Sequence, residues 1–151
     1  MGLIRLQRTA MPSGSVIQTV TKESSAEENT TSNTYQDTAL TLSITPTKSN
    51  SKIFAIASFN AGSTTASGGS ILSLFRGSTE ITMLGGSYTS GAGSSYSGQC
   101  LSVLDSPNTT SSVTYTVKQK SNVNGHDVRF NTHYGNVTGE TAHLTLMEIA
   151  G

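Results

Sequence analysis

Short segments of alternating hydrophobic and polar residues recur along this chain. Leu40, Leu42 and Ile44 alternate with threonine and serine, which is the period of a strand that buries one face. The same kind of segment returns at 16–20, 71–76, 80–84, 99–105, 113–117, 128–130 and 144–149. No segment long enough to form a helix shows apolar residues at helical spacing. Together with the segment 52–60, these patterns predict nine short strands and an all-β fold, as a β-sandwich, a jelly roll or a barrel.

The segment 52–60 is hydrophobic on both faces. One face carries apolar residues at every odd position from 53 to 59, and the other face carries Phe54 and Ile56. A strand of this kind is central in its sheet or covered on both sides. We therefore expect a second layer over Phe54 and Ile56.

The connections between the predicted strands differ in composition. Gly77-Ser78 predicts a hairpin between the two strands that flank it. Asn124-Gly125 favours the positive φ angles of a tight turn and predicts a second hairpin. The segment 21–33 places three glutamates among serine, threonine and asparagine, which is typical of a solvated loop.

The composition adds limits on function. The chain has 24 serines, 23 threonines and 15 glycines in 151 residues, and nine basic residues balance nine acidic ones. The regular spacing of its apolar residues argues against the disorder that so much serine, threonine and glycine would otherwise suggest. Scattered basic residues and zero net charge argue against nucleic-acid binding. No apolar run is long enough to span a membrane. Cys100, the single cysteine, is expected to be a small buried apolar residue.

The first residues stand apart from the rest. Residues 1–12 lack the alternation and precede Pro12-Ser13-Gly14, a plausible domain boundary. We interpret 1–12 as an arm that needs a partner surface and 13–151 as one domain. The alternative is an unattached terminus.

No catalytic or metal-binding pattern emerges. The sequence has no Gly-x-Ser-x-Gly elbow, and its glycine-rich segments have no following helix to bind phosphate. His126, His133 and His143 match no short metal-ligand spacing. A histidine close to the symmetry axis of an oligomer is a further hypothesis, since its protonation would destabilise the assembly in acid. We expect no enzymatic activity, no cofactor and no metal.

The segment 85–98 is the candidate recognition loop. It combines glycine and serine with Tyr88 and Tyr96, a composition typical of adaptable binding loops. Tyrosine rings also stack on sugar faces. The alternative is a flexible connection without a binding role.

Several phrases, taken together and in order, resemble small virion proteins of tailed phages, especially those of aquatic bacteria. They are residues 12–20 (PSGSVIQTV), 37–47 (DTALTLSITPT), 48–53 (KSNSKI), 76–79 (RGST), 104–111 (LDSPNTTS) and 146–151 (LMEIAG). The resemblance spans residues 12–151 and brings no catalytic motif. It implies a jelly roll of the tumour-necrosis-factor-like kind that assembles as a homotrimer. A subunit interface would then cover Phe54 and Ile56.

These observations lead to the hypothesis of a non-enzymatic virion protein, a trimeric jelly-roll knob on the virion surface that decorates or cements the head. Its partner is another virion protein, the major capsid or a tail protein. The chain begins directly at the arm without a fibre shaft, which favours this role. Within the arm, the residues expected to enter a groove or pair with acidic groups are Leu3, Ile4, Arg5, Leu6 and Arg8. The alternative is a tail-fibre tip or adhesin that recognises host-surface glycans.

Overall fold

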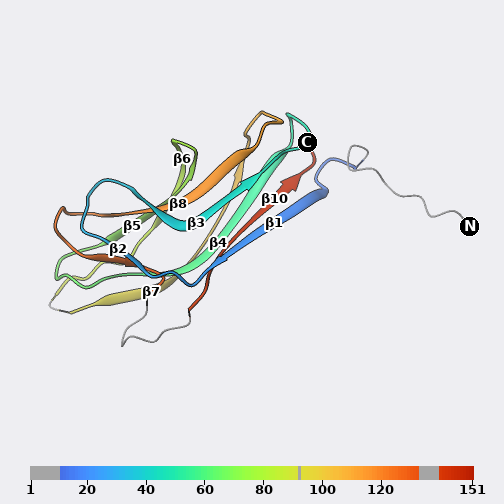
Figure 1. Ribbon diagram of the computed structural model, residues 1–151. Coiled ribbons are helices and arrows are strands. Elements are labelled where there is room, and N and C mark those ends of the chain that lie inside the picture. The colour runs from blue at the N-terminus through green and yellow to red at the C-terminus, as the bar shows by residue number, and fades with distance from the viewer. Residues whose placement is uncertain (1–10, 92, 133–139) are drawn as a thin grey trace, which may run out of the picture.

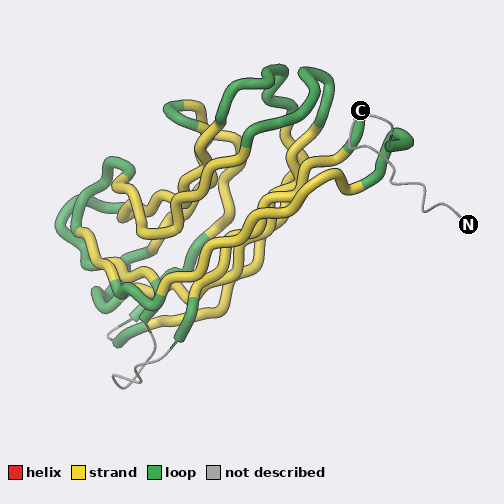
Figure 2. The backbone as a smooth tube through the Cα atoms, turned by 45° about the vertical axis from the view of Figure 1, so that its right-hand side comes forward, coloured by secondary structure: helices red, strands yellow, loops and turns green. Residues whose placement is uncertain are grey.

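The computed structural model describes residues 11–91, 93–132 and 140–151, and these residues form strands and loops without a helix. The strands make two antiparallel sheets that lie face to face (Figure 1). Figure 2 shows that loops gather at the two ends of these layers. The predicted all-β fold is therefore confirmed as two packed antiparallel sheets. The described residues include no helix that could cross a membrane.

The two sheets, called A and B, differ in size. Sheet A contains β1 (Val16–Ser24), β2 (Glu28–Thr30), β4 (Lys52–Ser63), β7 (Ser95–Asp105), β9 (Val128–Phe130) and β10 (Ala142–Ile149). Sheet B contains β3 (Gln36–Ile44), β5 (Ser70–Arg76), β6 (Thr79–Gly85) and β8 (Val113–Ser121) in the order β3-β8-β5-β6. Each of the nine predicted strands overlaps one of these ten.

The long strand β4 is the centre of sheet A. One edge pairs with β7 without interruption from Ile53 to Ser63. The other edge pairs first with β10 and then, from Ala61, with β9. Strands β1 and β2 complete the sheet beyond β10 and β9. The prediction of a central strand at 52–60 is confirmed.

The core lies between the sheets and consists of the inward residues of both layers. From β4 it takes the odd-numbered apolar residues 53 to 61, and from β10 it takes Leu144 and Leu146. Tyr115 of β8 is fully buried, and its hydroxyl donates to the Asp105 carboxylate at 2.6 Å. Arg76 of sheet B forms an ion pair with the same carboxylate at 2.7 Å. Asp105 closes β7, so these contacts join the two sheets.

Glu148 is a buried carboxylate at the end of β10. Thr47 donates to one of its oxygens through the backbone N–H at 2.7 Å and the hydroxyl at 2.8 Å, and the Gln18 amide donates to the other at 2.7 Å. Burial by itself raises the pKa of this carboxyl, but these donors and the nearby Ser51 hydroxyl outweigh it and lower the pKa. The charge is thus stabilised inside the fold.

Two sequence predictions about connections are wrong. Asn124-Gly125 does not close a hairpin, because β8 belongs to sheet B and the following β9 belongs to sheet A. Gly125 has a φ of 90°, but Asn124 does not have a positive φ. The predicted loop 21–33 contains the end of β1 and the short strand β2. Its three glutamates indicated a solvated loop, but in the structure the Glu28 carboxylate accepts the Ala39 N–H at 2.9 Å and Glu28 belongs to β2. The hairpin between β5 and β6 is confirmed.

Candidate functional site

The outer face of sheet A, which points away from sheet B, carries an exposed apolar patch at one end. In the strand register, Phe54 lies opposite Met147 of β10 and Leu104 of β7, and Ile56 follows two residues later on β4. Leu104 is 50% exposed, and the other three are half-buried. We call these four residues the apolar patch. The predicted pair, Phe54 and Ile56, thus lies within a larger apolar surface that a single chain leaves partly open to water.

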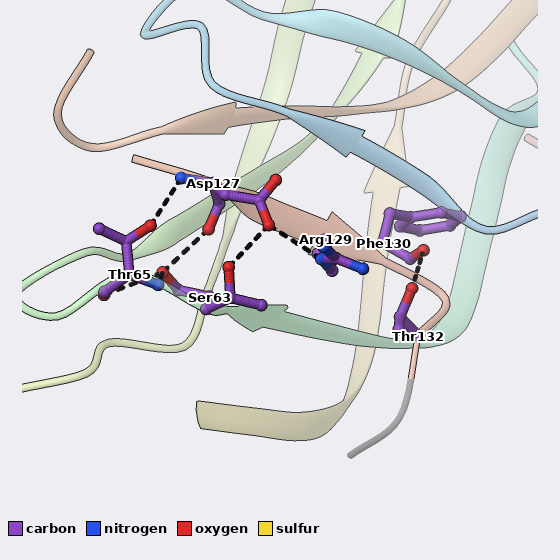
Figure 3. A network of polar contacts seen from close by, with 7 residues as sticks. Ser63, Thr65, Asp127, Arg129, Phe130 and Thr132 are labelled. Carbon is purple, nitrogen blue, oxygen red and sulfur yellow. Dashed lines mark hydrogen bonds and ion pairs between the residues drawn. The ribbon is translucent and has the colours of Figure 1, made fainter. Parts of the chain in front are cut away.

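The same face is polar at its other end, where the chain enters β9. Asp127 is fixed there by several contacts (Figure 3). Its carboxylate accepts from the Thr64 hydroxyl at 2.7 Å and from the Arg129 Nε at 2.9 Å. Its backbone N–H donates to the Thr65 hydroxyl at 2.9 Å, and its carbonyl accepts from the Ser63 hydroxyl at 3.1 Å. These bonds hold the Arg129 guanidinium in one orientation.

A row of residues crosses the sheet at this level. Tyr96 of β7 lies opposite Gly62 of β4, Gly62 lies opposite Arg129 of β9, and Arg129 lies opposite Asn29 of β2. A Cβ on Gly62 would come within 2.3 Å of the Tyr96 ring, so the ring lies over the bare backbone at Gly62. The hydrogen bond to Asp127, followed by smaller contributions that include Tyr96, raises the pKa of Arg129. Arg129 is therefore a permanent cation.

Beside this row lies a small polar hollow of about 170 Å³. It is lined by Glu27, Glu28, Asn29, Arg129 and Thr132. Burial raises the pKa of Glu28, although the hydrogen bond from the Ala39 N–H acts in the opposite direction. The hollow thus presents a guanidinium, an amide, a hydroxyl and two carboxyl groups within one small space.

Tyr88 lines a different hollow, of about 260 Å³, near the start of β5, which we call the apolar hollow. Its exposed walls are Tyr88, 60% exposed, and Met83, 66% exposed, and its other lining residues are Gly69, Ser70, Ile71, Gly85, Gly86, Ser87 and Asn122. Backbone bonds fix the loop, since Thr89 donates to the Gly68 carbonyl at 2.9 Å. No charged residue lines this hollow.

The structure therefore separates the two tyrosines of the predicted recognition loop. Tyr88 belongs to the apolar hollow, and Tyr96 belongs to β7 and the polar row. Sequence reasoning missed Asp127 and Arg129. Their spacing of two residues around Val128, which places both on one face of a strand, was the available signal.

Other predicted residues have different outcomes. Leu3, Ile4, Arg5, Leu6 and Arg8 of the arm lie outside the described residues. His133 also lies outside them. His143 lies on the outer face of β10, with Nδ1 at 3.6 Å from Oε1 of Glu23. Cys100 is exposed, so its predicted burial is wrong: it precedes the buried Leu101 by one position and points to the opposite face of β7. Three or more potential metal-ligating side chains do not cluster anywhere in the described part of the chain.

Comparisons with known proteins show only distant likeness. No protein-family model matches the chain, and neither does any curated protein. Among solved structures, the chain is similar to dimeric latent PorU from Porphyromonas gingivalis, with 12% identity and a TM-score of 0.39. The match covers 92% of this chain and 14% of the PorU chain. A likeness this distant carries no argument about function.

Proposed function

We propose that the protein is a non-enzymatic structural protein of a tailed-phage virion, a trimeric jelly-roll knob that decorates or cements the head. The resemblance of residues 12–151 to small virion proteins motivates this proposal. The apolar patch on the outer face of sheet A is the structural observation that carries it. A surface of this kind needs a protein partner, and a second and third copy of the chain supply one.

The strand order supports a jelly roll. Without the short strands β2 and β9, sheet A has the order β1-β10-β4-β7 and sheet B the order β3-β8-β5-β6. Of the connections between these eight strands, only β5 to β6 stays within one sheet. Eight antiparallel strands in two four-stranded sheets, joined by connections that pass between the sheets, are the arrangement of paired Greek keys.

The proposed trimer interface is centred on the apolar patch. Phe54, Ile56, Leu104 and Met147 carry no charge, and depletion of charge is typical of the core of an interface. In a closed three-fold arrangement, the patch of each subunit contacts a different surface of its neighbour. Residues 1–12 then remain available to attach the knob to the particle.

Attachment is tested by comparing the full chain with a variant that lacks residues 2–11. We expect the full chain to bind phage heads that lack their decoration and to ignore host cells. The shortened variant should remain a folded trimer and lose head binding. A shortened variant that still decorates heads would refute the role of the arm. Binding of the full chain to cells instead of heads would refute the decoration role.

The polar hollow favours a second candidate function. A tail-fibre tip that recognises host-surface glycans needs a solvent-accessible site with both donors and acceptors, and the hollow beside Arg129 has both. A tip should bind host cells and ignore empty heads. The same binding experiment therefore separates the two candidates.

A further inference from the structure

We propose that the polar hollow is a binding site for one neutral sugar ring, with Arg129 as its central contact. This inference deepens the second candidate function, because it names the site and the class of ligand. It does not depend on the trimer, whose proposed interface lies at the other end of sheet A. The argument rests on the fixed guanidinium, on the mixture of donors and acceptors, and on the size of the hollow.

The guanidinium is preorganised by its neighbours. Asp127 accepts from Arg129 Nε at 2.9 Å, and Asp127 is itself fixed through the Thr64 and Thr65 hydroxyls. Arginine loses much side-chain entropy when a ligand immobilises it. Here the Arg129 side chain is already restricted in the free protein, so less entropy is lost on binding. Asp127 is thus a positioning residue for Arg129.

The groups of the hollow match the hydroxyls of a sugar. Arg129 and the Asn29 amide can donate hydrogen bonds, and Glu27 and Glu28 can accept them. Each sugar hydroxyl both donates and accepts, so two neighbouring hydroxyls can bond to a guanidinium and a carboxylate at the same time. Because the carboxylates outnumber the single cation, the hollow disfavours anions such as phosphate.

The size of the hollow fits one ring. Its volume of about 170 Å³ corresponds to roughly five or six water molecules, at about 30 Å³ each. A longer glycan that leaves the hollow along the cross-strand row would meet the Tyr96 ring, which lies over Gly62. The apolar hollow around Tyr88 lacks this combination of charged donors and acceptors, because its lining carries no charged group.

Binding is tested with the full chain and defined probes. The methyl glycosides of glucose, galactose and mannose, together with N-acetylglucosamine, are titrated while backbone amide shifts are followed by NMR. Inorganic phosphate and methylammonium serve as the anionic and cationic probes. We expect at least one neutral saccharide to bind and to shift the amides around Arg129. Failure of every saccharide to bind, or a stronger response to phosphate or methylammonium at the same amides, would overturn the proposal.

Variants locate the site. Arg129→Ala should weaken saccharide binding by about tenfold or more, since it removes charge-assisted hydrogen bonds. Asp127→Asn should weaken it less, and Asn29→Ala, at an exposed position, provides a second test if Asp127→Asn does not fold. Lys118→Gln is the matched control, because Lys118 pairs with Asp37 at 2.7 Å on sheet B and neither residue lines the hollow. Equal affinity of Arg129→Ala, Asn29→Ala and the control would contradict the assignment.

The outcome is distinguishable from that of the functional proposals. Saccharide binding that depends on Arg129, without binding to host cells, supports this site and refutes the tip function. Loss of trimer mass in the Arg129→Ala variant would show that the residue acts through assembly, and would also overturn the proposal.

Discussion

The two ends of the outer face of sheet A share a strand and differ in chemistry. At one end β4 presents Phe54 and Ile56, and at the other it presents Ser58, Asn60 and Gly62. Beside the first pair lie apolar neighbours from β7 and β10, and beside Gly62 lie a tyrosine ring and a fixed guanidinium. In our proposals, the apolar end of this face serves as a protein interface and the polar end as a ligand site. The outward-facing side chains alone make one end apolar and the other polar, because both ends share the same strand.

Two glutamates near the two ends, the buried Glu148 and the half-buried Glu28, also differ. Glu148, next to Met147 on β10, is surrounded by donors, and its pKa is lowered despite burial. Glu28, which lines the polar hollow, is dominated by burial, and its pKa is raised. The fold therefore favours the ionised form of Glu148 at the apolar end and the protonated form of Glu28 at the polar end.

The largest expected effect comes from a charge in the apolar patch. Ile56→Asp should convert the proposed trimer to a folded monomer, because an unpaired carboxylate buried in an interface costs several kcal/mol. Light scattering gives the mass, and circular dichroism reports on the fold. Ser43→Glu, at an exposed position of β3 in sheet B, is the control and should remain trimeric if the proposal holds. A trimeric Ile56→Asp variant would remove the patch from the interface.

Replacing Glu148 should give the next largest effect. Glu148→Gln should lower the free energy of unfolding at pH 7 by about 1.5–3 kcal/mol, the range for hydrogen bonds to a charged group. A lowered pKa means that the wild-type contribution is present above about pH 4.5 and is lost as the pH falls through the folded-state value. Urea unfolding between pH 3 and 7 should therefore show a shallower pH dependence in the variant. An unchanged slope would disprove this role.

Gly62→Ala should damage the polar end by a smaller amount. The added methyl would lie 2.3 Å from the Tyr96 ring and 2.6 Å from the Ser95 carbonyl oxygen, so backbone as well as side chain must shift. Overpacking of this kind costs about 1–3 kcal/mol. Thermal unfolding measures the loss. Gly91→Ala is the matched control, since nothing lies within 4 Å of its Cβ position. Equal melting temperatures for the two variants would show that the position of the Tyr96 ring does not require a glycine at residue 62.

Glu28→Gln should act in the opposite direction to Glu148→Gln. A raised pKa favours the protonated carboxyl in the fold, so the contribution of Glu28 to stability is full below about pH 4.5 and is lost as the pH rises through the folded-state value. The neutral amide can still accept from the Ala39 N–H. The variant should therefore be as stable as the wild type, or more stable, at pH 7 in the same urea measurement. A clear loss of stability at pH 7 would contradict the pKa direction.

The smallest effect is expected for Tyr88→Ala. Tyr88 is well exposed, and surface changes of this kind shift stability by about 0.5 kcal/mol or less. Saccharide binding should remain unchanged in this variant and fall in Tyr96→Ala when an oligosaccharide is the ligand. The reverse pattern would move the recognition site back to the apolar hollow.

The sequence predicted the apolar end far better than the polar end. Alternation over two residues identified β4 and both of its faces, because local periodicity reports directly on burial in a strand. The polar row could not be predicted in the same way, since Tyr96, Gly62, Arg129 and Asn29 come from four separated segments. Only the pairing of β7, β4, β9 and β2 brings them together. The hairpin assigned to Asn124-Gly125 was wrong because the local turn signal does not reveal which sheet the next strand joins.

The solution mass of the wild-type chain tests the central claim most directly. Light scattering on the purified protein should give three times the chain mass of 15.7 kDa, with the apolar patch buried between subunits. A mass of 15.7 kDa across the concentrations tested would contradict the account, because the patch would then remain exposed in solution.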